Sequence, residues 1–329
     1  MKQMILSMTK VFNETNKKEA TQMNLRSYKY DPAKKAHEIR RRVLDMTLAR
    51  GGANLSQACS GAEIWATLYT RILNISDLET PITPEYFQGP PKAGYKGITG
   101  AVYNGVSTPD SDKIFLSPVQ ASIVQYAALT ATGRLSEEGY NQFGQPGSIV
   151  EHIGESHSPG QEVTTGSLGQ AISMAAGISM ARKIKGETGR QIVFLGDGEC
   201  QLGMTWEAVQ SMVQYKLNNM IVIVDRNRLQ CDGKMTTVCD MEDTLKARFE
   251  AFGCEVFEID GHDCAVLEAV ANQAPNAEGK PRVILANTFP TKGIEELDEK
   301  GERIHFVRID KDEVAKYEAV RERLLKLEV

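Results

Sequence analysis

The sequence contains no apolar run long enough to cross a membrane, so we expect no membrane association. Its first residues, MKQMILSMTKVFNETNKKEA, hold only a five-residue apolar stretch before Lys10. Such a stretch is too short for the core of a secretory signal peptide. We therefore expect a cytoplasmic protein.

Cysteine spacings typical of zinc sites or redox motifs are absent as well. None of the cysteines forms a C-x-x-C pair, and none follows a zinc-binding spacing. The six cysteines are Cys59, Cys200, Cys231, Cys239, Cys254 and Cys264. We expect them to be buried or incidental thiols.

Positive charge is not in excess either. The formal net charge is −5, which disfavours nucleic acid as a general partner. The basic run Arg40-Arg41-Arg42 is more typical of the solvated face of a helix, and we expect it there.

The overall composition is that of a globular protein, with 329 residues, 41% hydrophobic and 25% charged. Residues 1–28 are polar and lack a clear period, so we expect a mobile N-terminal arm. Residues 75–111 also show no period, as in a long functional or disordered loop. The predicted helices cover 32–50, 61–73, 118–132, 168–184, 206–217, 243–252, 264–273 and 310–329, and the predicted strands cover 113–116, 192–195, 220–224, 254–259 and 282–287.

Strands that alternate with helices in this way imply an α/β fold. The expected architecture is a doubly wound, mainly parallel sheet with helices on both faces. A sheet of this kind binds its ligand at the carboxyl edge of the strands. We therefore expect one ligand-binding domain over residues 29–329.

The most informative stretch is residues 191–233, QIVFLGDGECQLGMTWEAVQSMVQYKLNNMIVIVDRNRLQCDG. Two apolar runs enclose a helical pattern that Thr205 can cap, which is the order of a βαβ unit. Its right-handed crossover brings both strand ends to one edge of the sheet. Asp197 and Asn227 are therefore expected to converge there.

These two side chains predict a metal site. A carboxylate, an amide and one or two backbone carbonyls suit a hard cation such as Mg²⁺, which phosphate oxygens and water usually complete. Gly196 and Gly198 have no Cβ, so a diphosphate can approach their backbone closely. The predicted ligand is a metal-bound diphosphate.

Other interpretations of this stretch fit less well. A lone Gly-Asp-Gly is often a simple turn, and a dinucleotide fingerprint would need a glycine at Gln201. The phosphate loop of nucleotide hydrolases needs a Gly-Lys-Ser/Thr, which is absent here. A calcium loop that starts at Asp225 would place Leu229 and Thr236 at ligand positions.

Further motifs extend the pattern beyond the two turns. They are Gly196-Asp197-Gly198, Trp206-Glu207-Ala208, Lys216-Leu217, Val224-Asp225-x-Asn227-x-x-Gln230-x-Asp232-Gly233 and, upstream, Thr165-Gly166-Ser167-Leu168-Gly169-Gln170. Together, at these separations, they resemble the thiamine diphosphate motif of transketolases. The resemblance runs from about residue 34 to residue 305.

The resemblance implies roles for individual residues. Asp197, Asn227 and the carbonyl of Leu229 would bind Mg²⁺, and Gly198 would contact the diphosphate of thiamine diphosphate. The loop Gly166-Ser167-Leu168 would face the aminopyrimidine. The full set expected to bind the cofactor is Asn54, Gln120, Gly166, Ser167, Leu168, Gly196, Asp197, Gly198 and Asn227.

The resemblance also implies an activity and a partner. Transketolases transfer a two-carbon ketol unit from a ketose donor to an aldehyde acceptor. This chain matches only the first of their three domains, and the pyrimidine-binding domain that supplies the catalytic glutamate has no counterpart. It therefore resembles the N-terminal subunit of a split transketolase, which would act on small-molecule substrates in a heterotetramer with a separate C-terminal subunit.

The histidines depart from the family pattern. Asn54 and Gln120 stand where the family has histidine, and an amide cannot exchange protons near neutral pH. His152 falls on the family position that contacts the ketose donor, and His305 would be the remaining catalytic histidine. Leu202 replaces an interface glutamate. We therefore expect a diverged substrate pocket.

Two alternatives stay open. One is a subunit of another thiamine enzyme, such as a carboligase or a 2-oxo acid decarboxylating dehydrogenase, although Gly166-Ser167-Leu168-Gly169-Gln170 argues against it. The other is a non-catalytic relative that binds cofactor or partner, which Asn54, Gln120 and Leu202 motivate.

Overall fold

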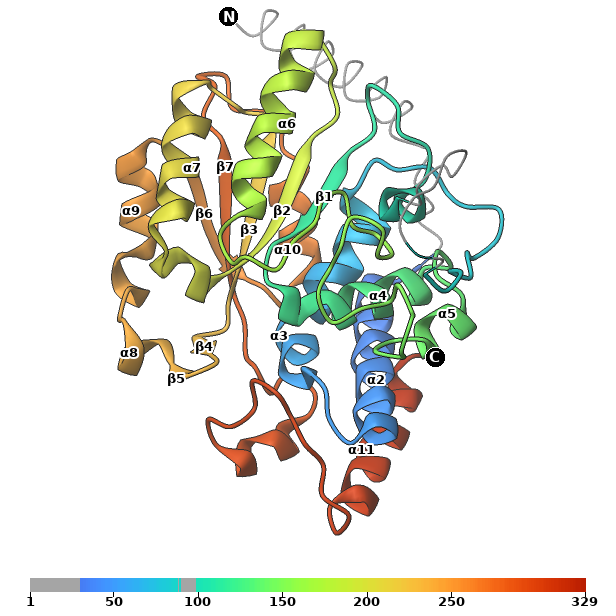
Figure 1. The fold of residues 1–329 in the computed structure, drawn as a ribbon. Helices are drawn as coiled ribbons and strands as arrows, with labels where there is room; N and C mark the ends of the chain where they lie inside the picture. Colours follow the sequence, from blue (N-terminus) through green and yellow to red (C-terminus); the bar gives the residue numbers. More distant parts are fainter. Residues whose placement is uncertain (1–29, 88, 90–98) are drawn as a thin grey trace, which may run out of the picture.

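The computed structural model describes residues 30–87, 89 and 99–329, and the arm predicted at residues 1–28 lies outside this range. Its centre is a five-stranded parallel sheet in the order β1-β2-β3-β7-β6 (Figure 1). The strands are β1 (Lys113–Leu116), β2 (Gln191–Gly196), β3 (Met220–Arg226), β6 (Glu255–Asp260) and β7 (Arg282–Asn287), and a separate hairpin is formed by β4 (Leu229–Gln230) and β5 (Gly233–Lys234). The prediction of a doubly wound parallel sheet is confirmed.

Helices pack on both faces of this sheet (Figure 1). One core contains α2 (Pro32–Arg50), α3 (Leu55–Thr67), α4 (Ser122–Ala131), α10 (Cys264–Ala271) and α11 (Val314–Leu327), and the other contains α6 (Ala171–Lys185), α7 (Gly203–Gln214) and α9 (Leu245–Phe252). Shorter helical segments are η1 (Leu68–Ile72), η2 (Gly100–Asn104), η3 (Val119–Ala121), α5 (Glu137–Asn141), η4 (Asp197–Gln201), α8 (Met235–Val238), η5 (Glu242–Thr244) and η6 (Glu295–Lys300).

Strand β3 is buried along its whole length, and β2 is buried up to its last residue, Gly196, which is half-buried. Their side chains alternate between the two cores, with Phe194 and Ile223 in one and Val193 and Val222 in the other. A strand covered on both faces needs apolar residues at every position, which explains the continuous apolar runs in the sequence. This burial holds the carboxyl ends of β2 and β3 at one edge of the molecule.

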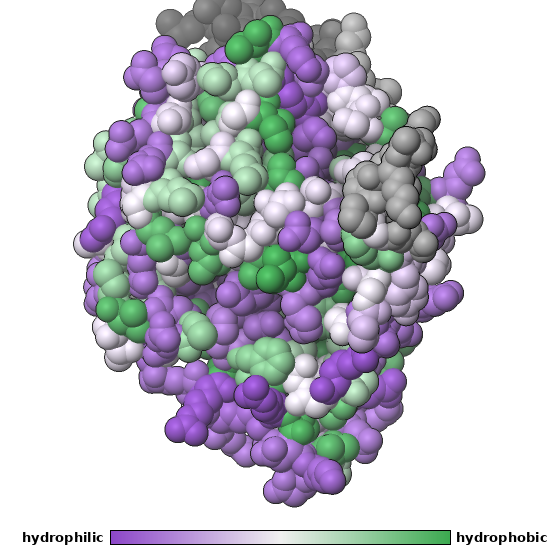
Figure 2. All heavy atoms as spheres, viewed as in Figure 1, coloured by the Kyte–Doolittle hydropathy of each residue, from purple (hydrophilic) through white to green (hydrophobic). Residues whose placement is uncertain are grey.

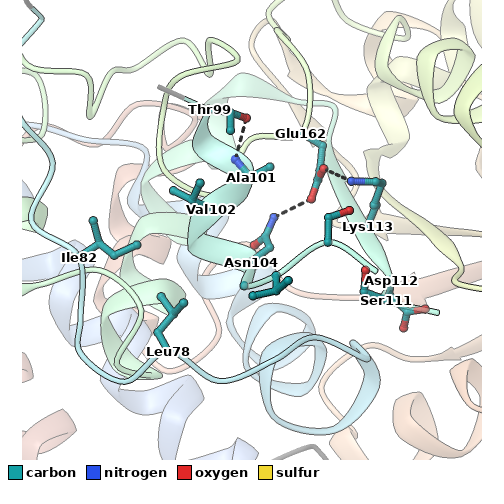
Figure 3. A pocket seen from close by; sticks show the side chains of 13 residues that line it. Leu78, Ile82, Thr99, Ala101, Val102, Asn104, Ser111, Asp112, Lys113 and Glu162 are labelled. Carbon is teal, nitrogen blue, oxygen red and sulfur yellow. Dashed lines mark hydrogen bonds and ion pairs between the residues drawn. The ribbon is translucent and has the colours of Figure 1, made fainter. Parts of the chain in front are cut away.

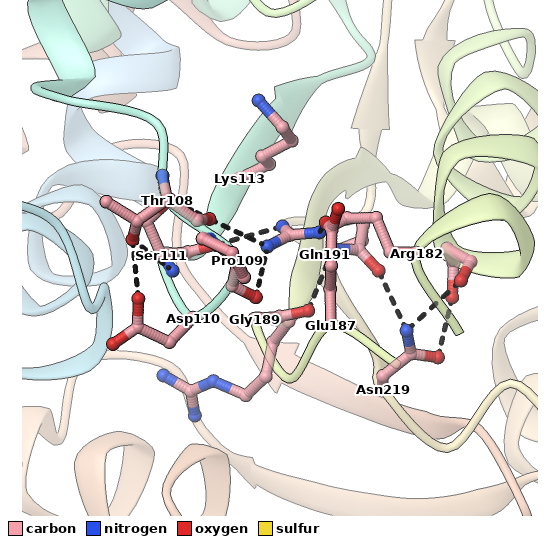
Figure 4. Close-up of polar contacts among 12 residues, drawn as sticks. Thr108, Pro109, Asp110, Ser111, Lys113, Arg182, Glu187, Gly189, Gln191 and Asn219 are labelled. Carbon is pink, nitrogen blue, oxygen red and sulfur yellow. Dashed lines mark hydrogen bonds and ion pairs between the residues drawn. The ribbon is translucent and has the colours of Figure 1, made fainter. Parts of the chain in front are cut away.

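The opposite, amino edge of the sheet is held by a buried arginine. Arg182 of α6 donates to the carbonyls of Thr108, Pro109 and Ser111, and it pairs with Glu187 at 2.7 Å (Figure 4). These contacts satisfy the guanidinium, so its burial is tolerated. They also attach the segment that leads into β1 to a helix that packs beside β2.

The sequence predicts no membrane-spanning helix and no paired or metal-binding cysteines. Along the described ranges, no helix combines the length and the apolar character needed to cross a membrane. All six cysteines are free thiols, as expected. Three of them, Cys59, Cys200 and Cys254, are buried, whereas Cys231 and Cys239 are exposed.

The prediction that Arg40 lies on a solvated helix face is wrong. Arg40 of α2 is only 1% exposed, and its guanidinium pairs with Glu63 of α3 and donates to the carbonyl of Cys59. Glu63 also lies 2.9 Å from Nδ1 of His262. The apolar spacing of the helix could not show this, because the charge is stabilised by a partner on another element.

Two helix starts also differ from the prediction. Helix α3 begins at Leu55 instead of residue 61, and every residue of it is buried, so its first turn has no polar face to mark it. Helix α7 begins at Gly203, and Thr205 therefore does not cap it. The Thr205 hydroxyl instead donates to the carbonyl of Glu199 at 2.7 Å.

Replacing Glu63 by Gln should destabilise the fold at neutral pH, because Arg40 would keep its buried charge without a counter-charge. We expect the free energy of unfolding in urea to fall by about 3 kcal/mol at pH 7. Burial opposes ionisation of Glu63, but the charge of Arg40 and the hydrogen bonds from His262 and Arg40 outweigh it and lower its pKa from 4.5 to about 2.

The stability that this ion pair adds should depend on pH in one direction. A folded-state pKa below the unfolded value means that the contribution is complete above pH 4.5 and is lost as the pH falls toward 2. Wild type and Glu63→Gln should therefore converge in stability over this range. A difference that stays constant between about pH 5 and pH 3 would contradict the assignment.

Candidate cofactor site

A cavity of about 250 Å³ lies at the carboxyl edge of β2 and β3. Gly196 at the end of β2 pairs in register with Asp225 of β3, so the turns that follow the two strands start side by side. Predicted site residues from several segments line this cavity, namely Gln120, Leu168, Gly196, Asp197, Gly198, Asn227, Leu229 and His305. The fold thus brings most of the predicted residues together.

Asp197 is held at the start of the first turn. Its side chain is buried, Oδ1 accepts the N–H of Gly198 at 2.8 Å, and Oδ2 accepts the N–H of Arg228 at 2.7 Å. The second bond joins the turn after β2 to the turn after β3. Because a carboxylate has further lone pairs, Asp197 can hold both turns and still bind a cation.

Hydrogen bonds determine which atom of the Asn227 amide is available. Its Nδ2 donates to Asp225 Oδ2 at 3.3 Å and to Ser60 Oγ at 3.4 Å, whereas Oδ1 accepts the N–H of Leu229 at 2.9 Å. The nitrogen is therefore turned toward the protein interior. The second lone pair of Oδ1 remains for a cation.

Asp225 is a buried carboxylate that orients its neighbours. It accepts the hydroxyl of Ser60 at 2.6 Å and the hydroxyl of Thr288, in addition to the Asn227 amide. Burial raises the pKa of Asp225, and these hydrogen bonds act in the opposite direction. The carboxylate thus connects α3, β3 and the segment after β7 behind the cavity.

The oxygen atoms gathered here fit a magnesium-bound diphosphate. Asp197, Asn227 and the carbonyl of Leu229 supply a carboxylate, an amide and a backbone oxygen, which is a ligand set suited to Mg²⁺. A Cβ built at Gly198 would have no neighbour closer than 3.4 Å, so there is room for a group to approach this backbone. Elsewhere in the described ranges, no three His, Cys, Asp or Glu side chains form a competing metal centre.

The charge of the cavity wall also favours a metal-bound diphosphate as the ligand. Asp197, Glu199, Asp225 and Asp232 all line the cavity, and none of the residues that the structure places in its wall is Lys or Arg. A diphosphate carries negative charge and would be repelled by this wall. A divalent cation would offset this repulsion, so the wall fits a diphosphate that is bound together with such a cation.

His305 reaches the cavity through contacts with the start of α3. Asn54 Nδ2 donates to the His305 carbonyl at 2.8 Å, and Gln57 Nε2 lies 3.4 Å from His305 Nδ1. Burial lowers the pKa of His305, although the charge of Asp232 opposes this, so the site favours the neutral imidazole. Asn54, predicted to bind the cofactor, is not part of the cavity wall and instead holds the His305 segment.

His152 lies outside this cavity. Its ring packs on Phe143 with 4.3 Å between centroids, its carbonyl accepts the hydroxyl of Ser122 at 3.0 Å, and burial lowers its pKa. Gly166 and Ser167 precede Leu168 but do not line the cavity either. The structure thus brings His305, and not His152, to the predicted metal ligands.

Comparison with known proteins identifies the family. Residues 104–323 match the family model of the transketolase thiamine diphosphate binding domain. A putative uncharacterized transketolase family protein of Sinorhizobium fredii is 33% identical, over 87% of this chain and 93% of the relative. The chain belongs to the transketolase family.

Other relatives in the transketolase family are named as single subunits. One subunit of the apulose-4-phosphate transketolase of Actinobacillus succinogenes is 33% identical over 87% of this chain and 94% of the relative. One subunit of the 6-deoxy-6-sulfo-D-fructose transketolase of Clostridium is 29% identical over 78% of this chain and 84% of the relative. These names support an N-terminal subunit, as the resemblance implied.

Solved transketolases share the fold. The transketolase of Campylobacter jejuni superposes with a TM-score of 0.67 at 24% identity and covers 90% of this chain. The chain spans 46% of the length of that protein. The predicted fold and the presence of a thiamine diphosphate-binding domain are therefore confirmed.

Three polar residues of this transketolase site were missed from the sequence. Gln57 and Ser60 lie on α3, far in sequence from the turns that they contact, and no local pattern marks them. Glu199 is buried directly after the Gly-Asp-Gly turn. Burial raises its pKa, and hydrogen bonds from three donors oppose the shift. Its position three residues after Gly196, as in a capping box, was a signal that the sequence contained.

A second, larger cavity of about 490 Å³ lies near the amino end of β1 (Figure 3). Apolar residues such as Leu78 and Val102 form much of its wall. Its polar groups are paired with each other, since Lys113 Nζ lies 2.8 Å from Glu162 and Asn104 donates to Glu162 at 3.1 Å. None of the predicted site residues lines this cavity.

Replacing Gly198 by Ala tests whether this backbone receives a ligand. The nearest atom to the new methyl group would be Gln230 Oε1 at 3.4 Å, so the free energy of unfolding should change by less than about 1 kcal/mol. The methyl group would occupy the space that a diphosphate needs, and the calorimetric affinity for thiamine diphosphate with Mg²⁺ should fall roughly tenfold or more.

Gly203→Ala is a suitable control, because this glycine begins α7 outside the cavity wall and a Cβ there would meet no atom within 4 Å. It should change neither stability nor affinity. Equal affinity of the Gly198→Ala variant and the wild type would show that the diphosphate does not lie here.

Proposed function

We propose that this chain is the diphosphate-binding N-terminal subunit of a split transketolase, with residues 29–329 as its cofactor-binding domain. The complex would transfer a two-carbon ketol unit from a ketose donor to an aldehyde acceptor. The observation that carries the proposal is the meeting of Asp197 and Asn227 where β2 and β3 end. Relatives named as subunits, which align over most of their own length, support a separate chain.

The cofactor would be held by the two turns. Asp197, Asn227 and the Leu229 carbonyl would bind Mg²⁺, while Gly196 and Gly198 would receive the diphosphate. When bound, thiamine diphosphate supplies an electron sink for cleaving a carbon–carbon bond next to a carbonyl. The protein contributes orientation and a low-dielectric wall.

Two side chains of the wall would meet the substrate with different chemistry. Burial favours the neutral imidazole of His305, and in that form it can accept or donate a hydrogen bond and can take up a proton. The Gln120 amide can orient an oxygen atom but cannot exchange a proton. We therefore assign proton handling on this side of the site to His305, and the assignment of His152 to the donor finds no support in the cavity.

A separate C-terminal subunit would complete the site and supply the catalytic glutamate, in a heterotetramer with two copies of each chain. Leu168 and Leu202 line the cavity and are both 37% exposed, which is typical of residues that a partner covers. In Figure 2, the region of α6 and α7 carries many apolar and weakly polar residues, with hydrophilic residues between them. We place the contact with the other subunits on this face.

Replacing Asp197 or Asn227 by Ala should abolish Mg²⁺-dependent binding of thiamine diphosphate to the two-subunit complex. Each variant removes one metal ligand, so the calorimetric affinity should fall about 100-fold or more. Asn287→Ala is a matched control, because Asn287 ends the adjacent strand β7 and its side chain contacts Arg226 and Glu258, neither of which lines the cavity. Wild-type affinity in Asp197→Ala would refute the ligand assignment.

Activity assays would separate the candidate functions. We expect the complex of both subunits to transfer a glycolaldehyde unit from a ketose to an aldehyde and not to release CO₂ from pyruvate. Release of CO₂ would indicate a decarboxylating thiamine enzyme instead. Cofactor binding without turnover on either substrate would favour the non-catalytic relative.

A further inference from the structure

Glu199 connects three separate segments of the chain. It lies in the short helix η4 after β2, is 2% exposed, and its carboxylate accepts hydrogen bonds from three donors. Oε2 accepts the N–H of Gly196 at 2.8 Å, and Oε1 accepts both the hydroxyl of Ser117 at 2.5 Å and the N–H of Gly169 at 2.7 Å. Ser117 and Gly169 are 82 and 30 residues away in sequence.

Each of these donors is next to a residue of the cofactor cavity. Gly196 precedes Asp197, Gly169 follows Leu168, and Ser117 begins the segment that carries Gln120. Ser117 and Gly169 are buried, so water cannot replace the carboxylate as their acceptor, and Gly196 is half-buried. The relative placement of three walls of the cavity therefore depends on one side chain.

We propose that Glu199 is a positioning residue whose carboxylate holds the segments of Gln120, Leu168 and Asp197 in the arrangement that binds the cofactor. This inference rests on the proposed function, because it concerns the same cavity. Glu199 acts through its neighbours, and it does so before any ligand is bound. It has no part in the proposed metal ligand set.

The chemistry of the three donors explains why a carboxylate is needed. An ionised carboxylate only accepts hydrogen bonds, and all three neighbours can donate. A glutamine would turn its NH₂ group either toward the N–H of Gly196 or toward the N–H of Gly169. In both cases one backbone N–H, that of the half-buried Gly196 or that of the buried Gly169, loses its acceptor, which is unfavourable.

The segment around Gly169 is the one that depends most on this contact. Gly169 has a φ of 76°, a left-handed conformation, and a Cβ at this position would lie 3.0 Å from Thr205 Oγ1. Such a turn is not stabilised by a regular helix or strand. Its hydrogen bond to Glu199 ties it to the η4 segment, so Leu168 should lose its fixed position when that bond is lost.

Hydrogen exchange on the full chain without cofactor tests the contact itself. In the wild type, the amide of Gly169 should be protected, because it is buried and bonded to Glu199. In Glu199→Gln, exchange should be roughly tenfold faster or more in the peptide that covers residues 165–170 or in the one that covers Gly196, because the single amide oxygen can serve only one of the two sides. Unchanged exchange in both peptides would overturn the inference.

Calorimetry on the two-subunit complex, with thiamine diphosphate and Mg²⁺ as the probe, tests the consequence. We expect Glu199→Gln to bind roughly tenfold more weakly or worse while its far-UV spectrum and cooperative melting are retained. Asp112→Asn is a matched control, because Asp112 is also a buried carboxylate that accepts two backbone N–H groups, from Asn74 and Arg190, but at the amino end of β1. It should lower the melting temperature and leave affinity unchanged.

Two further variants separate position from charge. Glu199→Asp keeps the charge but is one methylene shorter, so this variant should also bind the cofactor weakly. Wild-type affinity in Glu199→Asp would overturn the inference in favour of a purely electrostatic role. If Glu199→Gln does not fold, Ser117→Ala removes one of the three donors and should weaken binding roughly threefold or more. Wild-type affinity in Ser117→Ala would then overturn the inference.

The two proposals can fail separately. Equal affinity of wild type and Glu199→Gln would overturn the positioning role and leave the proposed function intact. Absence of cofactor binding to the wild-type complex would overturn the proposed function, and the exchange experiment would then decide alone whether Glu199 holds the segments.

Discussion

The parallel pairing of β2 and β3 is the constraint on which the site depends. Both strands are covered on both faces, so a one-residue shift in register would move each side chain into the opposite core, where it does not fit. Their carboxyl ends are therefore fixed relative to each other, with Gly196 beside Asp225. The turns that follow the two strands therefore start side by side. One hydrogen bond, from the Arg228 N–H to the Asp197 carboxylate, joins these two turns.

Behind these turns, buried carboxylates hold the parts of the site that strands do not reach. Asp225 orients Asn227 and connects β3 with α3, and Glu199 connects the segments around Ser117 and Gly169. Burial of a carboxylate is costly unless donors surround it, and each of these has three. The same carboxylates contribute negative charge to the wall, which is why we expect diphosphate binding to depend on a divalent cation.

Most of the fold was predictable because it is encoded in local patterns. All five sheet strands were expected within one or two residues of their observed bounds. The buried strands appear as apolar runs, whereas the edge strand β6 is mostly half-buried and combines apolar with acidic residues. Helix α3 was placed too late, because a helix buried on all sides shows no amphipathic period. The buried position of Arg40 was missed for a related reason, since its counter-charge Glu63 lies on a different helix.

In the site, the residue types and spacings of the two turns were enough to predict that Asp197, Gly198 and Asn227 lie together. A Gly-Asp-Gly turn after a strand and a strand that ends in Asp-x-Asn are both local features of the sequence. The contacts of Asn54, His305 and Glu199 were settled only by the tertiary structure. Asn54 and His305 are 251 residues apart, and Glu199 meets its partners through three segments that only folding brings together. Hydrogen bonds between distant segments leave no periodic pattern in a sequence. Burial and strand order do leave one, in the spacing of the apolar residues.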